Sequence, residues 1–318
     1  MDETATRPAP TSRPRLRRLL AVSLLGGFGA LVACAVIYSS GNAGISQAAA
    51  KAAIKRLNGR SWEKEPTQFI RELKRKLNDW RFKRTQNFLD GIFPTVLDHV
   101  RLEHGPIPTN DLAIICAVDT IRFLDIPGTL LSSDHWRIIT TARNIEGFHV
   151  NGPAVHVASI PRLTNLTRLR HLSLESETVA DEHLTVLRSL PSLTELSLNR
   201  ARIKGTGLTN LHGLTQLTHI DIAHTPVTDD YLSNLSGLTR LDSLYVGEHI
   251  TDAGIPHLLP LTNINTLGFM NSKVDNPGVD VVLKAFPKLK HLTLFYVEAY
   301  MDKINIDAYP HVTLEAAF

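Results

Sequence analysis

The sequence contains little cysteine and few aromatic residues. Of its 318 residues two are cysteine and 6% are aromatic, whereas 43% are hydrophobic. Neither a CxxC pair nor paired cysteine and histidine spacing occurs, which excludes a redox motif and a structural zinc site, and no disulfide is expected. The core must therefore consist mostly of leucine, isoleucine and valine, and Cys116 is expected to be a small buried hydrophobe rather than a nucleophile.

Motifs of catalysis and cofactor binding are missing as well. Gly26-Gly27-Phe28-Gly29 lies inside an apolar run, so it is not a phosphate loop. No nucleophile elbow and no oxyanion-hole signal accompany the histidines, serines and aspartates of the chain. The sequence predicts a protein that is not an enzyme, with no cofactor, no small-molecule substrate and no nucleic-acid partner.

Charge is unevenly distributed along the chain, although the net charge is only +3. Residues 1–18 contain five arginines against two acidic residues, and residues 51–88 contain twelve basic against four acidic residues. From residue 89 onward, seventeen basic side chains are outnumbered by twenty-five acidic ones. A basic stalk therefore precedes an acidic body, and an acidic body argues against nucleic-acid binding.

One apolar run near the N-terminus predicts a membrane anchor. Residues 19–38 read LLAVSLLGGFGALVACAVIY without a charge, and a helix of that length spans ~30 Å, the thickness of a hydrocarbon core. Arg13, Arg15, Arg17 and Arg18 directly precede the run. Because positive charge stays inside, the N-terminus is expected in the cytoplasm and the rest of the chain on the exported side.

Two alternatives to a spanning helix remain open. Leu31-Val32-Ala33-Cys34 resembles the bacterial lipobox, whose cysteine is lipidated after cleavage, although apolar residues follow Cys34 where that motif usually turns polar. A cleaved signal peptide would end near Ser46-Gln47-Ala48, but the apolar run is longer than such peptides have. A spanning helix and a lipid anchor at Cys34 both predict a membrane-tethered, exported body.

A repeat of about 24 residues fills most of the chain. Its marker is a pair of apolar residues separated by one residue, and nine pairs keep register with one step of 23 and one of 25. The pairs begin at Val100, Leu124, Phe148, Leu172, Leu196, Ile220, Leu244, Leu267 and Leu292. Such a pair is typical of a short strand that buries one face.

The residues between the pairs recur too and predict a helical or 3₁₀ return leg. After Leu172, apolar residues fall at Val179, Leu184, Leu187, Leu190 and Leu193. Asp181, Asp229 and Asp252 are expected as N-caps of these legs. One unit would gain ~16 kcal/mol of burial against ~24–48 kcal/mol of backbone entropy, so only stacked units are expected to fold.

These patterns resemble the leucine-rich-repeat family. Val227-Thr228-Asp229 and Ile250-Thr251-Asp252-Ala253-Gly254-Ile255 are similar to the V/I-T-D-x-G-L repeats of bacterial membrane-tethered members and of F-box members. The resemblance implies an α/β solenoid, a horseshoe of about nine 24-residue units with a parallel sheet on its concave side. The asparagine of the standard repeat is replaced by Thr129, Glu177, Ala201, Thr225 and Ser272, which leaves the curvature open. No F-box-like module precedes the repeats, which argues against a ubiquitin-ligase role.

The expected organisation has four parts. They are a basic cytoplasmic tail over 1–18, a transmembrane or signal-anchor helix over 19–38, a basic helical stalk and N-terminal cap over 39–94, and the leucine-rich-repeat domain over 95–318. Residues 46–92 are expected to be helical, with an apolar stripe of Phe69, Ile70, Leu73, Leu77 and Trp80. Val312-Thr313-Leu314 is expected as a last short strand that closes the other end.

The resemblance also implies that a protein partner binds the concave sheet. Residues that flank the apolar pairs point out of this face, and its centre is polar, acidic and rich in histidine: His149, His171, Ser173, Glu175, Glu195, Asn199, His219, Asp221 and Tyr245. Two other interpretations stay open for this surface. One is a contact that responds to pH through histidine, and the other is a metal site of His171, Glu195 and His219 on strands ~4.8 Å apart.

A second candidate surface is basic. It contains Arg71, Lys74, Arg75 and Lys76, followed by Arg81, Lys83 and Arg84. These side chains would either form the solvated face of the capping helices or contact an anionic membrane surface or polymer beside the anchor. The second possibility corresponds to a structural envelope protein that binds an anionic surface polymer.

Overall fold

The computed structural model describes residues 43–56, 60–64, 96–102, 107–127, 131–152, 155, 157–296 and 304–317. The chain divides into two compact units, Met1–Ile45 with Glu65–Val96 and Ser46–Lys64 with Leu97–Phe318, and we call the second the repeat unit. Three expectations lie outside the described residues: the spanning helix over 19–38, the apolar stripe within 69–80 and the basic stretch within 71–84. In the described part, no helix has the length and apolar character needed to cross a bilayer.

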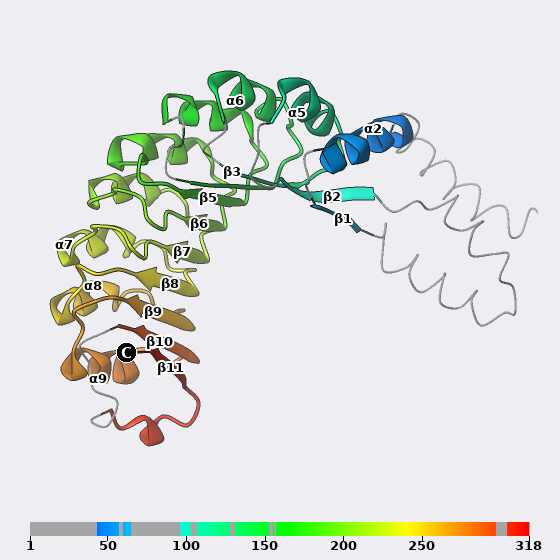
Figure 1. Ribbon diagram of the computed structural model, residues 1–318. Helices are drawn as coiled ribbons and strands as arrows, with labels where there is room; N and C mark the ends of the chain where they lie inside the picture. Colours follow the sequence, from blue (N-terminus) through cyan, green and yellow to red (C-terminus); the bar gives the residue numbers. More distant parts are fainter. Residues whose placement is uncertain are drawn as a thin grey trace, which may run out of the picture. The chain divides into compact units, whose positions relative to one another are not determined.

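The repeat unit is built on an eleven-stranded sheet whose strands follow chain order (Figure 1). The strands are β1 (Arg60–Lys64), β2 (Val96–Arg101), β3 (Phe123–Pro127), β4 (Gly147–Asn151), β5 (His171–Glu175), β6 (Glu195–Ser197), β7 (His219–Asp221), β8 (Ser243–Val246), β9 (Thr266–Met270), β10 (His291–Phe295) and β11 (Thr313–Ala317). From β2 to β11 each strand pairs in parallel with the next one.

Every apolar pair of the sequence lies in register with the pair on the neighbouring strand. One row of direct partners runs through the sheet: Val100, Leu124, Phe148, Leu172, Leu196, Ile220, Leu244, Leu267 and Leu292. The nine predicted strands are therefore confirmed. The register is kept even where the step is 23 or 25 residues, because the difference in length falls in the segments between the strands. The predicted last strand is confirmed as β11, where Leu314 lies opposite Leu292.

Short helical segments return the chain from each strand to the next. They are α5 (Thr109–Cys116), α6 (Ser133–Ile139), η2 (Val157–Asn165), η3 (Asp181–Ser189), η4 (Thr206–Leu211), α7 (Asp229–Leu232), η5 (Ser233–Leu235), η6 (Asp252–Gly254), α8 (Ile255–Leu258), α9 (Asn276–Ala285) and η8 (Ile306–Ala308), where η marks a 3₁₀ helix. Within the repeat unit the strands line the inner side of the curve and these legs line its outer side (Figure 1). The arrangement is that of a leucine-rich-repeat-like solenoid.

The core is one continuous apolar cluster between the sheet and the return legs. Alternate strand residues point into it, so that Leu172 and Leu174 are buried whereas His171 and Glu175 are half-buried on the other face. Burial of each such leucine contributes about 1.5–3 kcal/mol, which favours the observed strand phase over a shift by one residue.

The largest fully buried side chain, Trp136, lies in the early repeats. Trp136 of α6 is fully buried and meets the Phe148 ring edge to face, with the ring centroids 5.6 Å apart. Cys116 at the end of α5 is buried as predicted. Burial raises the pKa of its thiol to about 12, so the thiol is neutral at physiological pH.

The three aspartates expected as N-caps are the first residues of their legs instead. The N-cap positions are held by Ala180, Thr228 and Thr251. Each carboxylate accepts hydrogen bonds from the following repeat: Asp181 from Gly205 N–H at 3.1 Å and Gly207 N–H at 2.7 Å, Asp229 from Thr251 N–H at 2.9 Å and its hydroxyl at 2.7 Å, and Asp252 from Asp275 N–H at 2.9 Å. The reason is that backbone N–H groups of the neighbouring loop need acceptors. The predicted role of these aspartates is therefore corrected: they join one repeat to the next and do not cap their own leg.

A glycine of the following repeat leaves room for each of these carboxylates. A Cβ on Gly254 would lie 2.3 Å from Asp229 Oδ1, and one on Gly278 would lie 2.1 Å from Asp252 Oδ1. The aspartate and glycine of Asp252-Ala253-Gly254 therefore serve different contacts. The aspartate joins its repeat to the next one, whereas the glycine receives the carboxylate of the previous one.

The N-terminal end of the repeat unit is covered by α2 (Ala43–Arg56). Its residues Ala50, Ala53 and Ile54 are buried in the same core cluster. Gln47 Nε2 donates to Thr120 Oγ1 at 3.5 Å, and Arg56 forms an ion pair with Asp111. Helix α2 thus packs against this end of the core, whereas strand β1 interrupts the region 46–92 that was expected to be helical. Strand β1 adds to the sheet beside β2, so part of this region forms backbone pairs of a sheet and not of a helix.

Candidate functional site

The candidate site is a shallow groove of about 360 Å³ on the sheet face, lined by residues of β3 to β8. Eight of the nine residues predicted for partner binding line it: His149, His171, Ser173, Glu175, Glu195, His219, Asp221 and Tyr245. We call this surface the sheet groove. Asn199 is not among its lining residues, but its amide reaches the groove through Asp221.

Strand register places these side chains in rows across the sheet. His171, Glu195 and His219 are direct partners on β5, β6 and β7. Ser173, Ser197 and Asp221 form the next row of partners. Both rows flank the buried apolar pairs, so they must point to the opposite face of the sheet.

Two carboxylates at the centre of the groove are held by hydrogen bonds. Glu175 Oε1 accepts from the hydroxyls of Ser173 and Ser197 at 2.9 and 3.2 Å. Asp221 accepts from Ala223 N–H at 2.9 Å and from Asn199 Nδ2 at 3.1 Å. These bonds fix both carboxylates in position.

At the centre of the sheet groove, the pKa of Asp221 is shifted from its ordinary value. Burial raises its pKa above the ordinary value, and the negative charge of Glu175 raises it further. The hydrogen bonds from Ala223 N–H and Asn199 act in the opposite direction and lower it. The net direction is upward, so burial outweighs the two hydrogen bonds.

An aromatic ring closes each end of the groove. Phe123 lies across Gly147, where a Cβ would be 2.3 Å from its ring, and its ring centroid is 5.5 Å from that of His171. At the other end Tyr245 lies across Gly268 in the same manner, at 2.2 Å. Burial raises the pKa of the Tyr245 hydroxyl, and the charge of Asp221 adds to the shift.

Several lining residues were predicted to point out of this face but were not among the residues predicted to bind a partner. They are Phe123, Asp125, Gly147, Ser197 and Ser243. They stand at the same repeat positions, flanking the apolar pairs, so position alone was the available signal. Asp125 is already engaged by the Arg101 guanidinium at 2.8 Å, which leaves it less open to a partner than Glu175.

The three residues considered for a metal site are only partly brought together. His171 Nδ1 lies 2.8 Å from Glu195 Oε2. The His219 ring is instead beside the hydroxyl of Thr218, with Nδ1 2.8 Å from Oγ1. Across the described ranges, no group of three histidine, cysteine or acidic side chains has an arrangement that could hold a metal ion.

The repeat geometry and the groove define a leucine-rich-repeat-like solenoid with an open polar sheet face. No protein-family model and no curated protein matches the chain in sequence. Among solved structures, internalin C2 of Listeria monocytogenes is similar with 17% identity and a TM-score of 0.44, over 73% of this chain and 84% of that one. An internalin, InlF, of the same organism has 16% identity and a TM-score of 0.47, over 79% of this chain and 68% of that one.

Proposed function

We propose that the protein is a membrane-tethered scaffold that binds a protein partner through the sheet groove. The observation that carries this proposal is the shape of the groove. Its 360 Å³ is spread over six strands, which at a strand spacing of ~4.8 Å extend over ~24 Å. So shallow a strip suits the surface of another protein better than an enclosed small molecule.

The side chains of the groove support the same proposal. Aromatic rings at both ends, Phe123 and Tyr245, offer the large contact area that dominates binding energy at protein interfaces. Between them Glu175 and Asp221 are fixed by hydrogen bonds, so little side-chain entropy would be lost on binding. The groove is thus prepared for a partner that donates hydrogen bonds.

The tether rests on the apolar segment 19–38 and on the arginines before it. In this proposal the repeat unit lies on the exported side, held by a spanning helix or by a lipid on Cys34. A reporter enzyme that is active only outside the cytoplasm, fused after Phe318, is expected to be active. A stable but inactive fusion would reverse the proposed orientation.

Partner capture with matched variants tests the groove. The full chain in mild detergent is compared with a His171→Ala/Glu195→Ala/His219→Ala variant. The control variant, Glu182→Ala/His212→Ala/His257→Ala, removes the same residue types from the outer legs. We expect a partner that the wild type and the control retain and the groove variant loses. Equal capture by all three baits rules out the groove as the binding surface.

A pH-responsive contact is a second candidate, favoured by the 2.8 Å distance between His171 Nδ1 and Glu195 Oε2. Histidine commonly changes charge between pH 5 and 8, so its protonation would alter the charge of this row. A captured partner should then bind with different affinity at about pH 5.5 and pH 7.5. His171→Gln should remove that difference, and an unchanged difference would discard the candidate.

A further inference from the structure

One row of residues runs along one edge of the sheet, and we call it the strand-start row: its first member lies within β2 and each later member directly precedes a strand from β3 to β10. Its members are Asp98, Arg122, Glu146, Arg170, Thr194, Thr218, Asp242, Asn265 and Lys290. The backbone N–H of each member after the first donates to the carbonyl of the preceding member at 2.7–2.8 Å. These hydrogen bonds place the nine residues side by side along the edge of the sheet, so the charges of their side chains can be compared from one repeat to the next.

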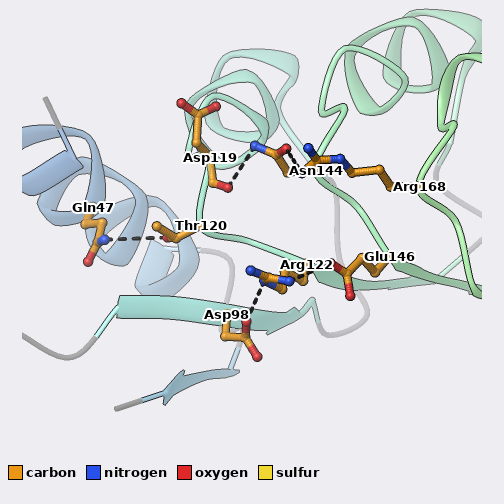
Figure 2. A network of polar contacts seen from close by, with 8 residues as sticks. All are labelled: Gln47, Asp98, Asp119, Thr120, Arg122, Asn144, Glu146 and Arg168. Atoms are coloured by element: carbon orange, nitrogen blue, oxygen red, sulfur yellow. Dashed lines mark hydrogen bonds and ion pairs between the residues drawn. The ribbon is translucent and has the colours of Figure 1, made fainter. Parts of the chain in front are cut away.

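The first part of the row neutralises its own charges (Figure 2). Arg122 lies between two carboxylates, 3.6 Å from Asp98 Oδ1 and 2.5 Å from Glu146 Oε1. Beside the row, Arg168 donates to the neutral amide Asn144 Oδ1 at 2.9 Å, and Asn144 Nδ2 donates to the Asp119 carbonyl at 3.0 Å. Within the row itself, Asp98 and Glu146 flank Arg122, so acidic and basic residues alternate at this end.

The last part of the same edge carries a surplus of positive charge. Arg240, Lys288 and Lys290 are exposed there, and Asp242 is the acidic residue among them. The Arg240 guanidinium donates to Gln216 Oε1 and the Lys288 ammonium donates to Asn263 Oδ1, both of which are neutral amides. Within the ranges that the structure describes, none of the three cations is paired with a carboxylate.

These cations line a recess of about 1070 Å³, which we call the edge groove. Thr218, Asn263 and Asn265 supply hydroxyl and amide groups along it. Exposed Pro287 contributes apolar surface, and the His311 ring also lines the groove. His219 lines both this groove and the sheet groove, so the two surfaces adjoin.

We propose that the edge groove binds an extended acidic segment of a partner protein. Carboxylates of such a segment would supply the counter-charges that Arg240, Lys288 and Lys290 lack, and attraction of this kind speeds encounter and fixes orientation. Peptide N–H groups of the same segment would donate to Asp242, and its backbone would meet the amide of Asn265.

Two other anionic partners fit the groove less well. A nucleic acid presents one charge every ~3.4 Å along each strand, and its sugar-phosphate backbone has no N–H group to donate to Asp242, which lines the groove. The phosphates of an anionic membrane likewise bring no peptide N–H donor for Asp242. The proposal does not depend on the sheet groove having a partner, because different side chains carry it.

Fluorescence anisotropy with a defined probe tests the proposal on the full chain in neutral detergent. The probe is a labelled peptide of about ten residues with alternating glutamate and serine, and a second peptide carries glutamine in place of glutamate. The edge variant is Lys288→Glu/Lys290→Glu, and the control is Lys204→Glu/Lys273→Glu, which reverses two exposed lysines elsewhere. All chains also carry alanine at Arg71, Lys74, Arg75 and Lys76, so that this basic stretch does not add to binding.

We expect the glutamate peptide to bind, the edge variant to lose about tenfold or more in affinity, and the control to stay within about twofold. Binding should also weaken as salt is raised, because the contact is between exposed charges. Equal affinities of the edge and control variants, or equal binding of the two peptides, would overturn the proposal. So would an oligonucleotide or an anionic vesicle that displaces the peptide and depends on the same two lysines more strongly. Unchanged circular dichroism of both variants verifies that the chains are folded.

Discussion

The early repeats and the later repeats are held to their neighbours in different ways. Before β5, neighbouring repeats meet through large buried rings such as Trp136 on Phe148, and through exposed ion pairs such as Arg122 with Glu146. From β5 onward, a carboxylate of one repeat accepts from the backbone of the next, as Asp229 does from Thr251. The difference teaches that a constant 24-residue step can rest either on bulk in the core or on a specific polar joint.

The largest expected effect concerns Cys116, which reports on opening of the early repeats. In a Cys34→Ser chain at about pH 8, a pKa near 12 makes its thiolate fraction on the order of 10³-fold smaller than that of an ordinary cysteine. Reaction with a disulfide reagent should therefore be slower in the folded than in the urea-unfolded chain by at least that factor. Comparable rates would show that α5 is open.

The same thiol gives a pH dependence of stability. Because its pKa is raised from 9.0 to about 12 on folding, the unfolded chain ionises first as pH rises. The stabilisation is therefore complete below about pH 9 and is lost progressively between pH 9 and pH 12. A Cys116→Ala variant should lose less stability over that range, as measured by urea unfolding.

Removing the bulk on which the early repeats depend should have the next largest effect. Trp136→Ala leaves a cavity beside Phe148 and is expected to cost about 3–5 kcal/mol of unfolding free energy. The matched control is Tyr296→Ala, because Tyr296 is 66% exposed. Cys116 should also react faster in Trp136→Ala, since both lie in the early repeats, and an unchanged rate would contradict local coupling.

A double-mutant cycle isolates the polar joint of the later repeats. Asp229→Ala is expected to cost about 1–3 kcal/mol, because it leaves Thr251 N–H without its acceptor. Gly254→Ala should also destabilise, since its Cβ would meet Asp229 Oδ1, whereas Gly213→Ala, which meets nothing within 4 Å, serves as its control. In the Asp229→Ala background, Gly254→Ala should reduce the free energy of unfolding by about 1 kcal/mol less than it does in the wild type. If the two losses of unfolding free energy were strictly additive, the contact between Asp229 and Gly254 would be refuted.

The smallest effect is expected at the early edge. Arg122→Ala removes two exposed ion pairs, which typically contribute only about 0–1 kcal/mol. The loss should shrink further in about 1 M salt, because screening weakens exposed charges. Arg188→Ala, on an outer leg, is the control, and a loss as large as that of Asp229→Ala would erase the distinction between the two regions.

The sequence was sufficient to place every strand of the nine units, because burial of the apolar pairs fixes both phase and spacing. Leu172 and its partners are recognised by their period alone. The role of Asp229 could not be predicted in this way. An aspartate that caps a helix and an aspartate that accepts hydrogen bonds from the next repeat stand at nearly the same position in the sequence. Likewise, Glu177 is exposed and its neighbour Ser176 is buried, whereas Ala201, Thr225 and Ser272 are buried at the position where the standard repeat has asparagine.

The composition of the sheet groove was predictable, whereas its packing was not. Rows such as His171, Glu195 and His219 follow from strand register. The placement of the Phe123 ring across Gly147 depends on a side-chain rotamer, which no periodic pattern encodes. The backbone also adopts the left-handed conformation after several strands, at Arg200, His224, Asn271 and Tyr296. This could not be predicted from the sequence, because none of these residues is glycine.

The aspartate joint makes repeats interchangeable only where both halves are present. Gly205 stands where other repeats have the joining aspartate, so its repeat has no carboxylate to offer there. It packs against Tyr231 of the next repeat, and this contact is specific to these two repeats. The repeat with Asp252 and Gly254 both gives and receives a joint. It is therefore the repeat to duplicate: in a copy inserted after the original, Thr251 and Gly254 of the copy would meet Asp252 of the original in the way that they now meet Asp229, and Asp252 of the copy would keep its contacts with Asp275 and Gly278.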